Sequence, residues 1–244
     1  MRKPLRGGFP PLLGIVALSV TAHPADADEF ALPAAPPAHT ARYTEVTEGE
    51  TIDLVAREWL VDGGLLLEST SSTGDRHLVR VDEHLRTRAW RFESESPQVE
   101  IESIKRGATI VVNGYRDGQA VRERVRLGDA RWIQSIERSL REFVLAADEG
   151  DRIRFDVVQP DTLGARTLQA RMLKTGTRRV AGEPTDVRHV RITLPGIGSL
   201  VWRSDYWFRL SDGLFVESRV TRGPPGTPET VVTLVDDSGP APHR

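Results

Sequence analysis

The chain contains no cysteine among its 244 residues, and only three of its 33 basic residues are lysines. The absence of cysteine excludes disulfide bonds, thiolate metal sites, a cysteine nucleophile and a lipid-modified N-terminal cysteine. The other basic residues are arginines, whose planar guanidinium groups make bidentate contacts with carboxylates and phosphates. These arginines are therefore suited to bind either anionic head groups or the chain's own glutamates. A genome rich in G and C also favours arginine codons over lysine codons and would give the same composition.

Long apolar runs are also scarce, and the one that stands out lies near the N-terminus. Three basic residues precede an apolar run from Phe9 to Ala22, and Ala25-Asp26-Ala27 follows it. This order is typical of a secretory signal peptide, which we place at residues 1–27. A retained transmembrane anchor is the less favoured alternative, because the run is short and is interrupted by prolines and a glycine. We therefore expect a periplasmic protein without a transmembrane span in the mature chain.

Charge of one sign is not in large excess. Removal of residues 1–27 takes away three positive charges and one negative charge, which moves the formal net charge from −2 to −4. A mildly acidic product gives no electrostatic reason to bind nucleic acid. Residues 28–41 are rich in proline and alanine and predict a tether, and residues 237–244 predict a disordered tail. The remaining residues, 42–236, predict a single β-rich domain.

Most of this domain shows the two-residue period of β-strands. In Val121–Leu127 the apolar residues share one face and three arginines occupy the other. Arg152–Val157 and His189–Leu194 repeat this pattern, and Asp62-Gly63-Gly64 separates two extended runs, as in a hairpin. Such strands favour an antiparallel sheet with one dry face and one solvated, cationic face.

One segment, at about residues 131–146, has a helical period instead. Its apolar residues recur at steps of three and four, namely Trp132, Ile133, Ile136, Leu140, Phe143 and Val144. A sheet with one apolar face and a single amphipathic helix can bury both surfaces together. The sequence therefore predicts a mainly β protein, a curved antiparallel sheet or half-open barrel that wraps one amphipathic α-helix.

The late hairpin resembles a known family. The run Trp202–Phe208 followed by Asp212–Val216, together with the order of long strands, one central helix and more strands, is similar to the exported bacterial family called domain of unknown function 3108. The resemblance implies a half-open barrel like that of the periplasmic lipoprotein carriers and their outer-membrane acceptor. It carries over no functional residue, and this chain lacks the lipid-modified cysteine of the acceptor.

Catalytic patterns are weak, so we expect a protein that is not an enzyme and needs no metal or cofactor. Gly196-Ile197-Gly198-Ser199 lacks the nucleophile elbow of hydrolases. His77 with Asp75, and His84 with its acidic neighbours, lack the usual spacing of metal ligands and suit solvated hairpin ends. Carboxylate pairs are plentiful, but a glycosidase needs a fixed separation that the sequence does not supply.

The aromatic residues carry the remaining functional signal. The residues predicted to line a concave slot for a lipid-like or amphipathic envelope ligand are Trp90, Phe92, Trp132, Ile136, Trp202, Tyr206 and Phe208. Ordinary core packing is the alternative, because large aromatic residues on a dry strand face are usually buried. Two functions follow: a binding protein for such a ligand, or a structural or interaction protein that supports envelope assembly with an envelope protein partner and no small ligand.

Overall fold

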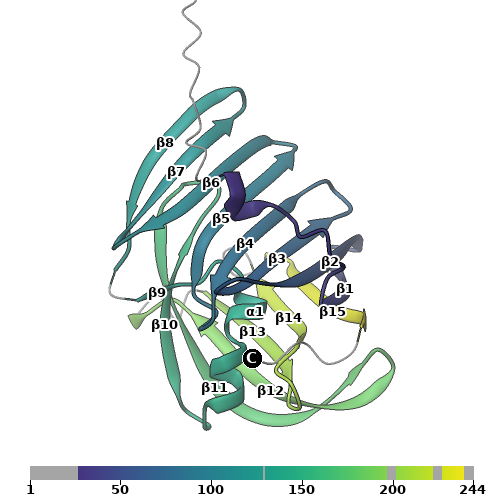
Figure 1. The fold of residues 1–244 in the computed structure, drawn as a ribbon. Helices are drawn as coiled ribbons and strands as arrows, with labels where there is room; N and C mark the ends of the chain where they lie inside the picture. The colour runs from purple at the N-terminus through teal and green to yellow at the C-terminus, as the bar shows by residue number, and fades with distance from the viewer. Residues whose placement is uncertain (1–26, 129, 197–201, 222–226, 239–244) are drawn as a thin grey trace, which may run out of the picture.

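The computed structural model describes residues 27–128, 130–196, 202–221 and 227–238, which form one fifteen-stranded sheet. Except for Ala27, the predicted signal peptide lies outside the described residues. The sheet curves strongly, as Figure 1 shows. This confirms the prediction of a mainly β protein built on a curved antiparallel sheet.

The first part of the chain contains the 3₁₀ helix η1 (Ala27–Phe30) and strands β1 (His39–Thr47), β2 (Glu50–Val61), β3 (Gly64–Ser71), β4 (Arg76–Asp82), β5 (Thr87–Glu95), β6 (Gln98–Arg106), β7 (Thr109–Arg116) and β8 (Gln119–Arg126). The second part contains β9 (Arg131–Trp132), α1 (Ile136–Ser139), α2 (Arg141–Ala146), β10 (Arg152–Val158), β11 (Ala165–Val180), β12 (Glu183–Thr193), β13 (Arg203–Arg209), β14 (Phe215–Thr221) and β15 (Glu229–Asp237).

The sheet is a long meander. Its strand order is β8-β7-β6-β5-β4-β3-β2-β1-β15-β14-β13-β12-β11-β10-β9, so every neighbour in space is a neighbour in sequence except for the pair β1 and β15. That antiparallel pair joins the two parts of the chain. Within the described residues no ladder connects β8 to β9, so the sheet is not closed.

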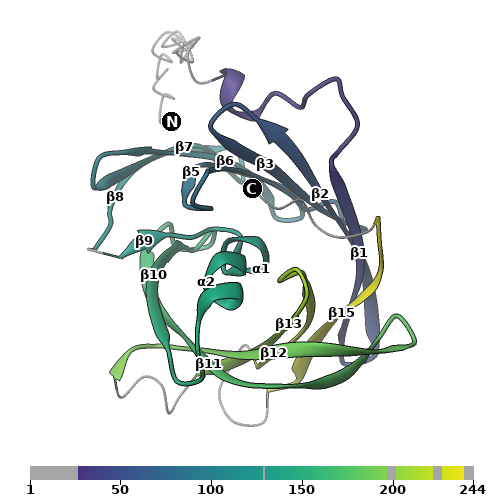
Figure 2. The ribbon, with the colours of Figure 1, turned by 60° about the horizontal axis from the view of Figure 1, so that its bottom comes forward.

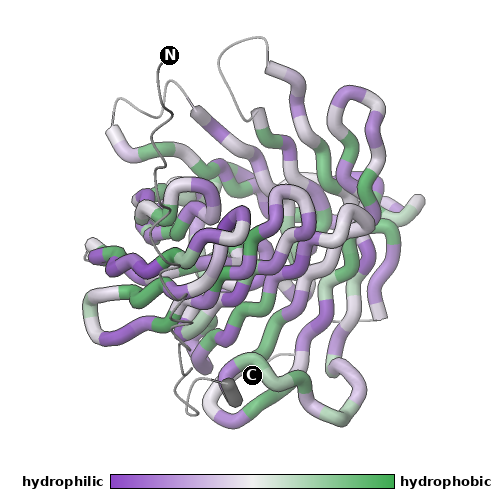
Figure 3. The backbone as a smooth tube through the Cα atoms, turned by 90° about the horizontal axis from the view of Figure 1, so that it is seen from above, coloured by the Kyte–Doolittle hydropathy of each residue, from purple (hydrophilic) through white to green (hydrophobic). Residues whose placement is uncertain are grey.

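Apolar and polar residues alternate along the strands (Figure 3). On β8, Val125 is buried while Arg122, Arg124 and Arg126 are exposed, as the sequence pattern predicts. The sheet thus places one set of side chains on its concave face and the other in solvent.

The helical segment is shorter than predicted. It begins at Ile136 and ends at Ala146, whereas Arg131 and Trp132 form β9 and pair with β10. The chain stays extended before α1 because the Gln134 side chain bonds both backbone groups of Val158. Figure 2 shows α1 and α2 inside the curve of the sheet.

The concave face holds two separate hydrophobic cores. The first core packs Leu140 and Val144 of the helical segment against β10 to β15. The second core lies over β3 to β8 and includes Trp132, Val158 and Leu163 from the other end of the sheet. The second core therefore fills the space between the two unpaired edges with side chains instead of a hydrogen-bonded ladder.

The segment predicted as a tether packs against the convex face instead. Phe30 is 5% exposed and contacts Leu78, Ala89 and Ile104, while the Arg91 guanidinium lies 4.8 Å from its ring centroid. Further along, the Trp59 indole donates to the Ala35 carbonyl. Proline and alanine give no strand or helix period, so the sequence pattern did not reveal this packing.

We expect Phe30→Ala to lower the free energy of unfolding by at least about 2 kcal/mol, because it removes a buried ring from this contact. Urea denaturation measures the change. Leu32, which is 42% exposed, provides the matched control, and Leu32→Ala should change stability by less than about 0.5 kcal/mol. Equal effects of the two substitutions would contradict the packing role of Phe30.

Candidate functional site

A cavity of about 440 Å³ lies on the concave face, between α1 and the strands β1 to β4 and β13 to β15. Its apolar wall consists of Tyr43, Ile52, Leu54, Ala56, Leu67, Val79, Tyr206, Leu214, Phe215, Val220 and Val232. The volume falls within the range of roughly 300–1,000 Å³ that is typical of small-molecule sites.

Strand register explains why the wall is apolar. On β2 the alternate residues Ile52, Leu54 and Ala56 face the cavity, and Leu54 lies opposite Tyr43 of β1. Side chains of a strand point to opposite faces in turn, so this spacing presents a continuous apolar surface. The next residue of the same phase is Glu58, a carboxylate on the dry face.

Polar residues line the end of the cavity near the turn between β3 and β4. They are Ser69, Ser71, Thr73, Asp75 and His77. Thr73 is exposed, so the cavity opens to solvent at this end. We call this end the mouth, and we call the opposite end, where Glu58 lies, the deep end.

His77 is held in a defined tautomer. The Trp90 indole N–H lies 3.3 Å from Nδ1, and since indole only donates, Nδ1 accepts and Nε2 carries the proton. The imidazole also lies 4.6 Å from the Phe92 ring. Burial lowers the pKa of His77 to about 4. At neutral pH the cavity therefore contains an uncharged imidazole that can donate a hydrogen bond.

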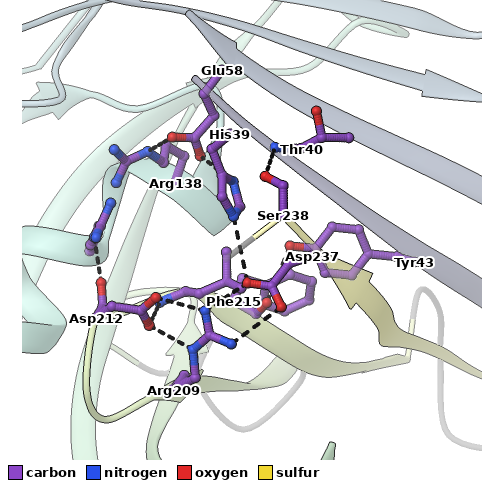
Figure 4. Close-up of polar contacts among 12 residues, drawn as sticks. His39, Thr40, Tyr43, Glu58, Arg138, Arg209, Asp212, Phe215, Asp237 and Ser238 are labelled. Atoms are coloured by element: carbon purple, nitrogen blue, oxygen red, sulfur yellow. Dashed lines mark hydrogen bonds and ion pairs between the residues drawn. The ribbon is translucent and has the colours of Figure 1, made fainter. Parts of the chain in front are cut away.

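A buried set of charged residues links the helical segment to the sheet at the deep end (Figure 4). We call this set the charged chain; in order of contact it comprises Arg138, Glu58, His39, Asp237, Arg209, Asp212 and Arg141. Its residues come from α1, α2, β1, β2, β13, β15 and the turn after β13.

The first contacts of the charged chain join α1 to β1 and β2. Arg138 Nε lies 2.9 Å from Glu58 Oε2. The His39 ring lies between two carboxylates, 4.0 Å from Glu58 and 3.7 Å from Asp237. Arg138, Glu58 and His39 are all less than 9% exposed, so the charges of Arg138 and Glu58 depend on each other and not on water.

The remaining contacts join α2 to β13 and β15. Arg209 bonds Asp212 and Asp237, at 2.7 Å and 2.8 Å, and the hydrogen bonds to Asp212 raise the pKa of Arg209. Arg141 donates to the Asp212 carbonyl. Burial, with Arg138 close by, lowers the pKa of Arg141 to about 10, which still leaves it charged at neutral pH.

Gly213 permits this close approach. Its φ is +70°, and a Cβ there would lie 2.8 Å from Arg141 Cγ. A larger residue would strain the backbone and push α2 away from the turn.

The residues predicted to line a slot are distributed over both cores. Tyr206 lines the cavity. Trp90 and Trp132 are at most 1% exposed in the second core, and Phe92 packs against that core. Phe208 is fully buried in the first core, against which Ile136 and Trp202 pack. The structure stacks Trp90 on Phe92 and Tyr206 on Phe208, but the two pairs belong to different cores.

Sequence reasoning missed the residues of the charged chain. His39 lies in the predicted tether and Asp237 in the predicted tail, yet β1 begins at His39 and β15 ends at Asp237. One signal was present at Glu58, because it continues the inward phase of Leu54 and Ala56 on β2. An acidic residue at an inward position predicts a buried partner.

In the described part of the chain, no helix is long and apolar enough to cross a membrane. No three histidine, aspartate or glutamate side chains in those same residues gather where they could hold a metal ion.

No known protein family and no curated protein matches the chain in sequence. Solved structures do match its fold. The β-barrel-like protein of domain of unknown function 1849 from Brucella abortus has 12% identity, a TM-score of 0.58, and covers 83% of this chain and 97% of its own. The hypothetical lipoprotein YmcC from Escherichia coli has 17% identity, a TM-score of 0.44 and 90% coverage of both chains. The Brucella structure shows a shared β-barrel-like fold, and membership of family 3108 stays a prediction.

The contact between Arg138 and Glu58 can be tested with a double-mutant cycle. We expect Arg138→Met and Glu58→Gln each to destabilise the protein by about 3 kcal/mol, because each leaves a buried partner without its counter-charge. The loss of unfolding free energy in the double variant should be at least about 1 kcal/mol smaller than the sum of the losses in the two single variants. Urea denaturation of the four proteins measures this, and additive effects would contradict the pairing.

The environment of His77 predicts a pH dependence. Between about pH 6.5 and pH 4 the unfolded chain binds a proton at His77 that the folded chain does not, so stability falls as the pH falls, by about 3 kcal/mol over this range. His77→Gln keeps an acceptor for Trp90 and removes the titration. Between pH 6.5 and pH 4 the free energy of unfolding of this variant should therefore fall less than that of the unmodified protein. If the two proteins lose stability equally over this pH range, the lowered pKa of His77 is wrong.

Proposed function

We propose that the protein is a non-enzymatic protein of the periplasm that binds a lipid-like or amphipathic ligand in the concave cavity. The observation that carries the proposal is the cavity itself, whose long apolar wall lies beside a polar mouth. A ligand with an apolar tail and a polar group matches this division. The export features of residues 1–27 support the location.

The arrangement of the charged chain supports a preformed site. It fixes Arg138 and Arg141 of the helical segment to the sheet at the deep end. At the mouth the lining residue Thr73 is exposed. An apolar tail that enters by the mouth gains roughly 25 cal/mol for each Å² of apolar surface it removes from water, without the cost of opening a closed core.

A second candidate function is that of an interaction protein without a small ligand, and strand β8 favours it. This edge strand exposes Arg122, Arg124 and Arg126, which make no ion pair within the described residues. Arg57 and Arg76, by contrast, are both paired with Glu68. An exposed edge with unpaired arginines suits an extended acidic segment of an envelope protein.

Filling the cavity tests the first candidate. Ala56 lines the cavity, and Ala56→Phe places a ring in it. We expect the affinity for the uncharged fluorescent probe N-phenyl-1-naphthylamine to fall at least tenfold, about 1.4 kcal/mol. Ala120→Phe makes the same change at an exposed position of β8 and should alter the affinity less than twofold.

Bound material distinguishes the two candidates. Organic extraction and mass spectrometry of the freshly purified protein should yield an amphiphile under the first candidate. If no amphiphile is found and Ala56→Phe leaves probe binding unchanged, the first candidate is wrong and the interaction role takes its place.

A further inference from the structure

We propose that the ligand's polar group is a cation, so that the cavity takes an amphiphile with an apolar tail and an ammonium group. This inference rests on the proposed function and adds the chemical class of the ligand. It follows from the charges that line the cavity, from the neutral state of His77 and from the surface around the mouth.

Carboxylates are among the residues that line the cavity where it meets solvent. Asp75 and Glu45 line the cavity near the mouth, and Glu137 lines it from the first turn of α1. Asp75 is partly buried, and its carboxylate has no hydrogen bond or ion pair within the described residues. A partly buried carboxylate beside an apolar wall attracts a cation more strongly than one in bulk water does.

The arginines that line the cavity already have partners within the protein. Arg138 contacts Glu58, and Arg141 donates to the Asp212 carbonyl, both at the deep end. Arg57 also borders the cavity, but it bonds Glu68. An anionic head group at the mouth would therefore meet the Asp75 carboxylate, and each of these guanidinium groups already has an acceptor of its own.

His77 does not supply a positive charge either. Its pKa is lowered to about 4 by burial, so the ring is neutral in the neutral pH range. Nε2 carries the proton, and it has no protein partner within the described residues. This N–H can donate to a hydroxyl or carbonyl oxygen of the ligand near its ammonium group, and because the ring is neutral it brings no positive charge to the cavity.

Further carboxylates lie exposed around the mouth. The exposed carboxylates at this end of the sheet are Glu48, Glu50, Asp53, Glu95 and Glu229. Contacts place two of them beside the turn between β3 and β4: Ser72 of this turn bonds the Asp53 backbone, and the Glu95 side chain lies beside Gly74 of the turn. None makes an ion pair with another described residue. A rim of like charges raises the local concentration of cations and slows the entry of anions.

The test compares amphiphiles that share one tail. Dodecylammonium, dodecanol and dodecyl sulfate, each below its micelle concentration, compete with N-phenyl-1-naphthylamine for the purified protein at low and at physiological ionic strength. We expect dodecylammonium to displace the probe at a concentration at least tenfold lower than dodecyl sulfate does, with dodecanol between them. Added salt should narrow the difference, because it screens the carboxylates at the mouth.

Variants of the cavity carboxylates test which residues cause the preference for dodecylammonium. Asp75→Asn and the pair Asp75→Asn with Glu45→Gln should reduce the preference for dodecylammonium over dodecyl sulfate to less than threefold. The matched control removes two exposed carboxylates that do not line the cavity, by Glu100→Gln and Glu123→Gln. The control should keep the full preference. Thermal melting of each variant checks that it is folded, and the single Asp75→Asn variant serves if the pair is not.

The outcomes separate the two proposals. If the probe binds and dodecyl sulfate competes as well as dodecylammonium, or if Asp75→Asn leaves the preference intact, the cationic class is wrong and the binding function stands. If neither the probe nor any of the three amphiphiles binds, the proposed function fails, and the inference fails with it.

Discussion

The concave face of a single long sheet has to be covered, and the chain provides little with which to cover it. Fifteen strands curve around a helical segment that runs only from Ile136 to Ala146. This segment fills the space over β10 to β15, and the aromatic residues near Trp90 fill the space over β3 to β8. The region between these two cores has no element of its own, and the cavity lies there.

The charged chain helps to position the helical segment over the sheet. A short helical segment buries too little apolar surface to fix its own orientation. Its two buried arginines add contacts to Glu58 of β2 and to the Asp212 carbonyl in the turn after β13. Buried ion pairs contribute little net stability compared with apolar packing, but they penalise alternative positions of the helix strongly. The charged chain thus holds one end of the cavity while the other end stays open to solvent.

The arginine content has two different consequences. Across β2 to β6, and again at Trp207, the guanidinium groups pair with the chain's own carboxylates or lie over an aromatic ring, as Arg178 does at 3.6 Å from the Trp207 centroid. On the edge strand β8 they remain exposed. Exposed carboxylates, by contrast, lie at the end of the sheet where the cavity has its mouth.

The sequence by itself determined the class of fold, because alternation at strands such as β8 and the hairpin turns depend on local chemistry. It also located the only α-helical segment among the described residues, although Trp132 belongs to a strand there. It did not reveal β11, since the exposed second half of that strand and the irregularity between Met172 and Lys174 obscure the period.

The cavity and the charged chain were decided by tertiary structure. His39 and Asp237 are 198 residues apart and meet because β1 pairs with β15, and which aromatic residues border a cavity depends on how far the helical segment reaches across the sheet. Pairing over such distances in the chain has no local signal, because it depends on the curvature of the whole sheet and not on the residues next to each position.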